Sequence, residues 1–157
     1  LGNDRIDGAA GSDTADFSGA PRAVRVSLAR GTALGQGNDT LTAIENVLGS
    51  MFDDLITGDV LANVLIGGDG NDVIRGGDGA DEIDGGDGSD QLFGDLGDDS
   101  LDGSAGNDSL RGGAGADHLT GSDGVDQFAS VDSFDQVISD LLDRPSRPGR
   151  PRARNRL

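Results

Sequence analysis

The sequence predicts an all-β protein, built as a flattened solenoid of short parallel strands. Glycine opens each of nine consecutive nonapeptide units between residues 49 and 129, without a miss. Within each unit a large apolar residue stands at position 8, and an aspartate, or once an asparagine, stands at position 6. A fixed interval of this kind is typical of repeat proteins, in which each repeat forms one small structural unit.

The composition supports this class. The 157 residues include 28 Gly, five Phe and no Cys, Trp or Tyr, so little side-chain volume is available for a conventional core. Of the 29 acids 27 are Asp, whose short side chain forms local hydrogen bonds in turns. Residues 1–143 hold all 29 acids and only 6 of the 12 Arg. This charge favours cations, and disfavours nucleic acid or an anionic membrane as partners. No run of 18 apolar residues exists, so we expect no transmembrane segment.

Residues 1–16 contain partial repeat units. Residues 2–6 match the end of one unit, and residues 8–15 match most of another. Because the chain begins in the middle of a repeat, we expect it to be a segment of a longer polypeptide.

Residues 17–48 are expected to be an inserted β segment. Val24, Val26 and Leu28 alternate there with polar residues, which predicts a longer half-buried strand. Gly8 and Gly49 are 41 residues apart, and this distance is not a multiple of nine. The insertion therefore resets the repeat frame.

Residues 49–129 form the repeat body, in which position 8 is the packing position. Its side chains are those of Ile56, Leu65, Ile74, Ile83, Leu92, Leu101, Leu110, Leu119 and Phe128. Strand residues alternate between two faces, so a strand of about three residues has position 8 inward and positions 7 and 9 outward. The six preceding residues are expected to form the turn, where glycine permits positive φ. Two units then make one coil, with two short sheets facing each other across the apolar row.

The residues at position 6 are the candidate metal ligands. They are Asp54, Asp72, Asp81, Asp90, Asp99, Asp108, Asp117 and Asp126, with Asn63 in the second unit. Stacked coils would bring these carboxylates together, and a hard divalent cation would turn their repulsion into a binding site. Calcium takes six to eight oxygen ligands, whereas magnesium prefers a rigid octahedron and its own waters. Zinc prefers Cys or His, and this chain has only His118.

These observations predict folding that is coupled to calcium, with the chain unfolded in the cytosol and folded outside the cell. Two alternatives are acidic turns that only solubilise the chain and a flexible glycine-rich linker. Neither alternative needs a nine-residue interval or an aliphatic residue at position 8. An EF-hand would need a loop of twelve residues ending in Glu between two helices, and no such Glu is present.

An enzyme active site is not expected within this chain. It has one His, no Cys and no nucleophile motif, and we assign its carboxylates to metal binding rather than to acid–base work. His118 stands at the outward position 7, where a solvated surface residue is expected.

The two C-terminal segments differ from the repeats. Residues 130–143 are interpreted as a cap on the open end, formed by a short amphipathic helix or by a final strand. Residues 144–157 hold six Arg, three of the four Pro and no acid. This composition predicts a disordered tail, with contact to anionic lipid or polysaccharide as an alternative role.

Residues 67–93, which read GGDGNDVIR GGDGADEID GGDGSDQLF, resemble the RTX (haemolysin-type) calcium-binding nonapeptide repeat. The resemblance implies a right-handed parallel β-roll, closed by a strand over residues 135–140. It also implies a calcium ion between each repeat and the next but one. The limit is seven sites, of which about five are well formed. The other two adjoin Phe52 and Leu61, which replace glycine at position 4.

The resemblance further implies backbone carbonyl ligands at positions 1 to 4. These are Gly67, Gly68, Asp69, Gly70, Gly76, Gly77, Asp78, Gly79, Gly85, Gly86, Asp87, Gly88, Gly94, Gly97, Gly103, Gly106, Gly112, Gly113 and Gly115.

Proteins with such repeats are secreted by Gram-negative bacteria through a type I pathway, so the resemblance implies an extracellular protein. One alternative is the C-terminal folding and secretion module of a larger secreted enzyme or toxin, such as a protease, lipase, epimerase or haemolysin. Another is a spacer segment of an adhesin that calcium makes rigid. The Arg-rich tail departs from the usual export signal of such proteins.

Overall fold

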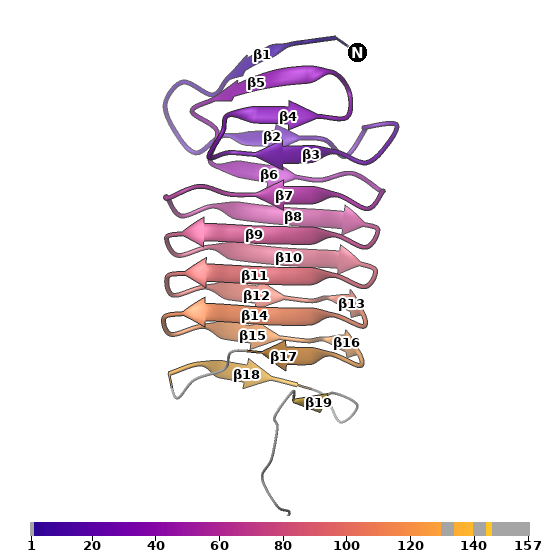
Figure 1. The fold of residues 1–157 in the computed structure, drawn as a ribbon, viewed down its shortest axis with the longest axis vertical. Helices are drawn as coiled ribbons and strands as arrows, with labels where there is room; N and C mark the ends of the chain where they lie inside the picture. The colour runs from indigo at the N-terminus through magenta and orange to yellow at the C-terminus, as the bar shows by residue number, and fades with distance from the viewer. Residues whose placement is uncertain (1, 130–133, 140–143, 146–157) are drawn as a thin grey trace, which may run out of the picture.

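The computed structural model describes residues 2–129, 134–139 and 144–145, and within them it is an all-β solenoid. The strands lie one above another along the long axis of the molecule (Figure 1). Their pairing along the repeats is parallel, so the all-β parallel solenoid predicted from the nonapeptides is confirmed. None of the described segments is a helix that could cross a membrane.

Most strands are short, as the repeat interval requires. They are β1 (Arg5–Asp7), β2 (Thr14–Asp16), β3 (Arg25–Ser27), β4 (Thr32–Leu34), β5 (Asn38–Thr42), β6 (Asn46–Leu48), β7 (Leu55–Thr57), β8 (Val64–Asp69), β9 (Val73–Asp78), β10 (Glu82–Asp87), β11 (Gln91–Leu96), β12 (Ser100–Asp102), β13 (Ala105–Gly106), β14 (Ser109–Ala114), β15 (His118–Thr120), β16 (Asp123–Gly124), β17 (Gln127–Ala129), β18 (Gln136–Ile138) and β19 (Arg144–Pro145).

Successive repeat strands alternate between two sheets. Among the described residues, sheet A has the order β1-β5-β4-β3-β7-β9-β11-β14-β17-β19. Sheet B has the order β18-β15-β12-β10-β8-β6-β2, and β13 and β16 pair beside it. Because each unit crosses from one sheet to the other, two units complete one coil, and sheet neighbours are 18 residues apart.

The core is a row of position-8 side chains from both sheets. In sheet A Ile74 lies beside Ile56, and in sheet B Ile83 lies beside Leu65. The position-8 residues from Ile56 to Leu119 are at most 1% exposed. Each buried side chain of this size stabilises the fold by about 1.5–3 kcal/mol, so this row is the main apolar contribution of the repeats.

The strands of intact units are longer than the three residues predicted. β8, β9, β10, β11 and β14 each have six residues, which cover positions 7 to 9 and then positions 1 to 3 of the next unit. In β9 both Ile74 and Gly76 are buried, so position 1 also points inward. Glycines without Cβ let neighbouring coils stay close enough to continue the ladder, as where Gly86 pairs with Gly68. The turn is therefore confined to positions 4 to 6.

The N-terminal insertion adds an antiparallel hairpin to sheet A. β3 pairs in parallel with β7, which puts Val26 beside Ile56 in the place of a repeat strand. β4 then pairs antiparallel with both β3 and β5. Val24, Val26 and Leu28 are buried as their alternation predicted, although the strand itself has only three residues.

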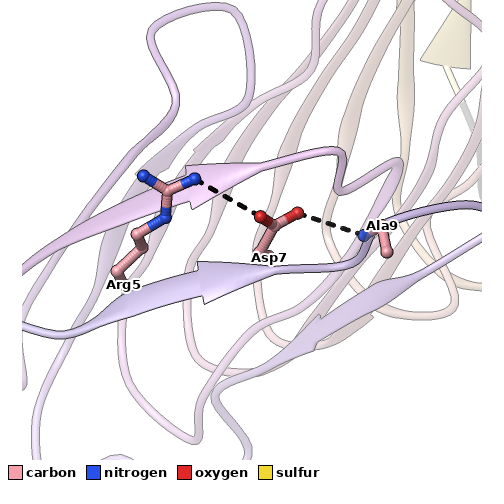
Figure 2. A network of polar contacts seen from close by, with 3 residues as sticks. All are labelled: Arg5, Asp7 and Ala9. Carbon is pink, nitrogen blue, oxygen red and sulfur yellow. Dashed lines mark hydrogen bonds and ion pairs between the residues drawn. The ribbon is translucent and has the colours of Figure 1, made fainter.

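The N-terminal edge strand of sheet A is β1, whose three residues are exposed. The guanidinium of Arg5 lies 3.3 Å from the carboxylate of Asp7, and the backbone N–H of Ala9 donates to the other oxygen of that carboxylate at 3.2 Å (Figure 2). These surface contacts close the bend that follows β1.

Residues 134–139 continue the repeat period. β18 pairs with β15 at the usual offset, so Val137 lies beside Leu119, and this part of the expected cap is a strand rather than a helix. Arg144–Pro145 form the short strand β19 beside β17. The rest of the predicted cap, 130–133 and 140–143, and the predicted disordered tail over 146–157 lie outside the described residues.

Candidate metal centres between stacked turns

The carboxylates at position 6 are buried at the bends of the solenoid. Eight of these aspartates are at most 3% exposed: Asp54, Asp72, Asp81, Asp90, Asp99, Asp108, Asp117 and Asp126. The ion pairs of Arg5 with Asp7 and of Arg75 with Asp95 do not involve the carboxylates of the central turns, which are those of Asp72, Asp81, Asp90, Asp99 and Asp108. A buried carboxylate without a cation is costly, so these positions need a further explanation.

One oxygen of each carboxylate joins two coils. The Oδ1 atom of Asp90 accepts a hydrogen bond of 2.7 Å from the backbone N–H of Asp72 in the preceding coil. Asp99 accepts in the same way from Asp81 at 2.9 Å, and Asp108 accepts from Asp90 at 2.8 Å. The column of bonds runs from Asp54 to Asp126 on one edge of the solenoid and from Asn63 to Asp117 on the other. One oxygen of each carboxylate, Oδ1, therefore serves to hold neighbouring coils together.

The second oxygen is left without a hydrogen bond in the central turns. The buried Oδ2 atoms concerned belong to Asp72, Asp81, Asp90, Asp99 and Asp108. Each of these atoms faces the position-1 glycine of its own unit. A Cβ built on Gly85 would lie 3.0 Å from the Cγ of Asp90 and 3.0 Å from the carbonyl oxygen of Gly103 in the next coil. The carboxylate and this carbonyl therefore border the same small space.

The same arrangement recurs at the other turns of the body. A Cβ on Gly94 would meet both Asp99 and the carbonyl of Gly112, and a Cβ on Gly76 would meet both Asp81 and the carbonyl of Gly94. The polar atoms nearest to each of these Cβ positions are oxygens, one from a carboxylate and one from a backbone carbonyl. This donor set suits a hard cation such as calcium, which binds carboxylates and carbonyls.

Burial changes the acidity of these carboxylates. Desolvation raises the pKa of Asp72 to about 7, against the hydrogen bond from Asp54, and nearby carboxylates raise the pKa further. The same causes raise the pKa of Asp108 to about 7 and that of Asp99 to about 6. Desolvation also raises the pKa values of Asp81 and Asp90. Each of these carboxylates is therefore harder to ionise without a counter-ion than an ordinary aspartate, and a bound cation would favour the ionised form.

Backbone carbonyls would have to supply most ligands of any cation bound here. Among the described residues no three His, Cys, Asp or Glu side chains converge on one point. The backbone at position 2 has positive φ in Gly68, Gly77 and Gly86, and also in the non-glycine residues Asp95 and Ser104. Positive φ is thus a property of position 2 in these units, kept even where the residue is not glycine and the conformation is strained.

Two predicted sites differ from the others. The carboxylate of Asp54 accepts three hydrogen bonds, from the Val24 N–H at 2.7 Å, the Ser50 N–H at 2.6 Å and the Ser50 hydroxyl at 2.9 Å. Protein donors therefore occupy the oxygens that a cation would need. At the next turn the amide N–H of Asn63 donates to the carbonyl of Glu45 in the preceding coil at 2.9 Å, on the side where the aspartates have Oδ1. The oxygen of Asn63 faces Gly58, as Oδ2 faces the glycine in the other turns, but it is neutral and accepts the N–H of Asp59 at 2.8 Å.

The glycines predicted at position 4 lie where two coils approach most closely. Gly70 and Gly79 have positive φ, and a Cβ on either would be less than 3 Å from the backbone of Phe52 or Leu61 in the preceding coil. Phe52 and Leu61 themselves are exposed and have no positive φ. The first two turns therefore differ from the later ones in backbone as well as in side chain.

Two columns extend further than the sequence prediction. Asp135 accepts a hydrogen bond of 3.2 Å from the N–H of Asp117, as the position-6 residue of a further unit. The nine-residue interval from Asp126 to Asp135 was the signal for it. At the N-terminal end, Asp13 has a buried Oδ2 without a hydrogen bond beside Gly8, and its N–H donates to Glu45 at 2.9 Å.

A comparison with protein families gives one match that covers more than half of the chain. The model described as RTX calcium-binding nonapeptide repeat (4 copies) matches residues 1–16, 57–92 and 93–128. A comparison with curated proteins gives no match. The matched segments include the turns with unpaired Oδ2 atoms and the N-terminal partial units.

Proposed function

Because this chain belongs to the RTX calcium-binding nonapeptide repeat family, we propose that it binds calcium between each turn and the next but one. The observation that carries the proposal is the row of buried Oδ2 atoms that face carbonyl oxygens of the next coil without a hydrogen bond. The bends following Asp72, Asp81, Asp90, Asp99 and Asp108 give five such places. Bound calcium would supply the positive charge that these carboxylates lack.

The chain's own residues have distinct parts in each proposed site. The position-6 carboxylate offers Oδ2, while its Oδ1 keeps the bond to the preceding coil. The carbonyls of positions 1 to 4, among them Gly76, Gly77, Asp78 and Gly79, are the proposed neutral ligands. Asp54 and Asn63 are excluded from this set, because their polar atoms already bond to protein.

Calcium binding of this kind would couple to folding. A site with a dissociation constant near 10⁻⁴ M contributes about 1.4 kcal/mol at about 1 mM calcium. Five such sites contribute about 7 kcal/mol, which is within the stability range of a whole domain. At cytosolic calcium the sites would be nearly empty, so we propose that the chain folds after export from a Gram-negative bacterium.

We assign no catalysis to this chain, and place it as a folding and calcium-binding module. Whether it serves a larger secreted enzyme or toxin, or an adhesin, depends on sequence beyond these residues. The proposed calcium binding does not depend on which of these roles the chain has.

Circular dichroism with calorimetric titration tests the proposal. In calcium-free buffer we expect a largely unfolded chain, and at about 5 mM calcium we expect a β spectrum. The titration should give about five calcium ions per chain. A β spectrum that is unchanged by a chelator, or a stoichiometry near zero, would contradict the proposal.

A further inference from the structure

The two outer faces of the solenoid differ in charge. In sheet A, positions 7 and 9 point outward from β3, β7, β9, β11, β14 and β17, and they include Arg25, Arg75 and Arg111 but no acid. Acids on the same sheet include Asp7 on the edge strand β1 and Asp95 at repeat position 2 on β11, which pairs with Arg75. The corresponding outward positions of sheet B include Asp16, Glu82, Asp84 and Asp102 but no arginine. A basic face on a chain with a formal net charge of −17 is not what the composition alone would produce.

A groove lies at the N-terminal end of this basic face. It has a volume of about 440 Å³, and its lining includes the side chains of Arg25, Arg30 and Arg75 with the hydroxyl groups of Ser27 and Thr57. Arg25 and Arg30 are exposed, and neither is in an ion pair among the described residues. Two exposed arginines and a third at the edge of the groove favour an anionic ligand there.

The basic face continues from the groove along the solenoid axis. Thr57 pairs with Arg75, Arg75 with Phe93, and Phe93 with Arg111, so these side chains stand in one column on adjacent strands. The guanidinium of Arg75 lies over the ring of Phe93, with 4.1 Å between Cζ and the ring centroid. It also lies 3.6 Å from the carboxylate of Asp95, and these contacts hold it over the sheet.

We propose that the part of the outer face of sheet A formed by β3, β7, β9, β11 and β14 binds an anionic polysaccharide, whose acid groups pair with Arg25, Arg75 and Arg111. Guanidinium groups form bidentate hydrogen bonds with carboxylate or sulfate groups. The hydroxyl and amide side chains between the arginines, such as Thr57 and Gln91, offer hydrogen bonds to sugar hydroxyls. The surface is a flat sheet, so it fits an extended chain.

The spacing of the arginines selects a sparsely charged polymer. Arg75 and Arg111 are two strands apart, which corresponds to about 10 Å. Duplex nucleic acid carries one charge about every 1.7 Å, so most of its phosphates would meet no partner here and would be repelled by the acidic body. A polysaccharide with one acid group on some of its sugars places fewer charges along the same length.

The test measures binding of fluorescent hexasaccharides to the full chain at about 5 mM calcium. The probes are a uronic-acid hexamer, a sulfated hexamer and a neutral hexamer. We expect binding of an acidic hexamer and none of the neutral one, and the preference between the two acidic probes identifies the acid group. Arg75→Gln and Arg111→Gln should each weaken binding by about tenfold or more.

Arg5→Gln is the matched control, since it changes the net charge equally but lies on β1, outside the groove and the column (Figure 2). It should leave hexamer affinity unchanged. Circular dichroism and calcium stoichiometry of each variant separate lost folding or lost calcium from lost sugar binding. Equal weakening by Arg5→Gln, equal binding of the neutral hexamer, or no binding at all would overturn the proposal. Tighter binding of single-stranded DNA would also overturn it, as would association between copies that Arg75→Gln abolishes.

Discussion

The aspartate at position 6 has two separate tasks in one side chain. Its Oδ1 accepts the backbone N–H of the preceding coil, and its Oδ2 is buried without a hydrogen bond in the central turns. Asn63 shows what an amide does in this place, because its N–H group donates to the carbonyl of Glu45. An asparagine therefore replaces the acceptor that faces the preceding coil by a donor, and on the side assigned to calcium it leaves a neutral oxygen, which in Asn63 accepts the N–H of Asp59.

We accordingly predict that Asp90→Asn changes stability in opposite directions with and without calcium. In a chelator, the variant should retain more β structure than the original chain, because a buried charge is removed and the amide can donate to a carbonyl. At about 1 mM calcium it should lose about 1.4 kcal/mol for each site that it served. Circular dichroism in the chelator measures the gain in β structure, and urea denaturation at about 1 mM calcium measures the loss of stability.

Asp54→Asn is the comparison for this experiment, because protein donors occupy the Asp54 carboxylate. It should lower stability in both conditions and leave the calcium stoichiometry unchanged. Equal losses of bound calcium in the two variants would count against the distinction drawn between these turns.

The raised pKa values give a pH dependence with a definite sign. The folded-state pKa of Asp72 and Asp108 is about 7 and that of Asp99 is about 6, above the ordinary value of 3.8. Between these limits the folded chain binds more protons than the unfolded chain, so the stability of the calcium-free form falls as pH rises from about 4 to 7. Calcium affinity should change in the opposite sense, because protons compete with the cation for the same oxygen atoms.

Circular dichroism of calcium-stripped protein at several pH values between about 4 and 8 measures the folded fraction, and so this dependence. About 0.3 M salt should be present throughout, since it screens the general repulsion between surface acids but acts less on buried groups. Calcium-free stability that increases with pH across this window would show that these carboxylates are not the controlling groups.

At the scale of the element, the glycine that opens each unit decides whether neighbouring coils can approach. Gly85 faces inward on β10, and a Cβ there would enter the space bordered by Asp90 and the carbonyl of Gly103. We predict that Gly85→Ala lowers stability by about 1–3 kcal/mol, as overpacking usually does, and also removes bound calcium. Denaturant melts and calcium titration measure the two effects.

Gly19→Ala is the matched control, because Gly19 lies in a turn of the insertion with no atom within 4 Å of the Cβ position and without positive φ. It should change stability by less than about 0.5 kcal/mol. If both substitutions were equally harmless, the close approach at Gly85 would not matter to the fold.

The repeat strands show which features could be predicted from the sequence and which could not. The position-8 residues correctly predicted which face points inward and that one coil has 18 residues. The reason is that each unit has only one large side chain to bury. Strand length was underestimated, since propensity assigns Gly76 and Gly77 to a turn, whereas pairing with the neighbouring coils keeps them in β9. That tertiary effect cannot be seen in one unit alone.

The candidate sites were predictable in part for a similar reason. The nine-residue interval located every position-6 carboxylate and marked the turns at Phe52 and Leu61 as different. It did not indicate that Val24 and Ser50 donate to Asp54, because Val24 is brought there by the insertion. The continuation to Asp135 was visible in the spacing, but the change from glycine-rich sequence obscured it.

At the scale of the whole molecule, the solenoid combines one thin apolar row with two columns of buried acid. The apolar row is complete without metal, while the columns of Asp72, Asp90 and Asp108 and of Asp81 and Asp99 are not electrically balanced. Stability should therefore depend on calcium cooperatively along the axis, since each coil contributes groups to the sites above and below it.

A crystal structure grown in about 5 mM calcium would examine the central claim most directly. The account predicts ions at about 2.3–2.6 Å from the Oδ2 atoms of Asp72, Asp81, Asp90, Asp99 and Asp108 and from carbonyl oxygens of the adjoining coil. It predicts none bound to the carboxylate of Asp54. Ordered turns with no ions in these five places, or ions bound only at the exposed acids, would contradict it.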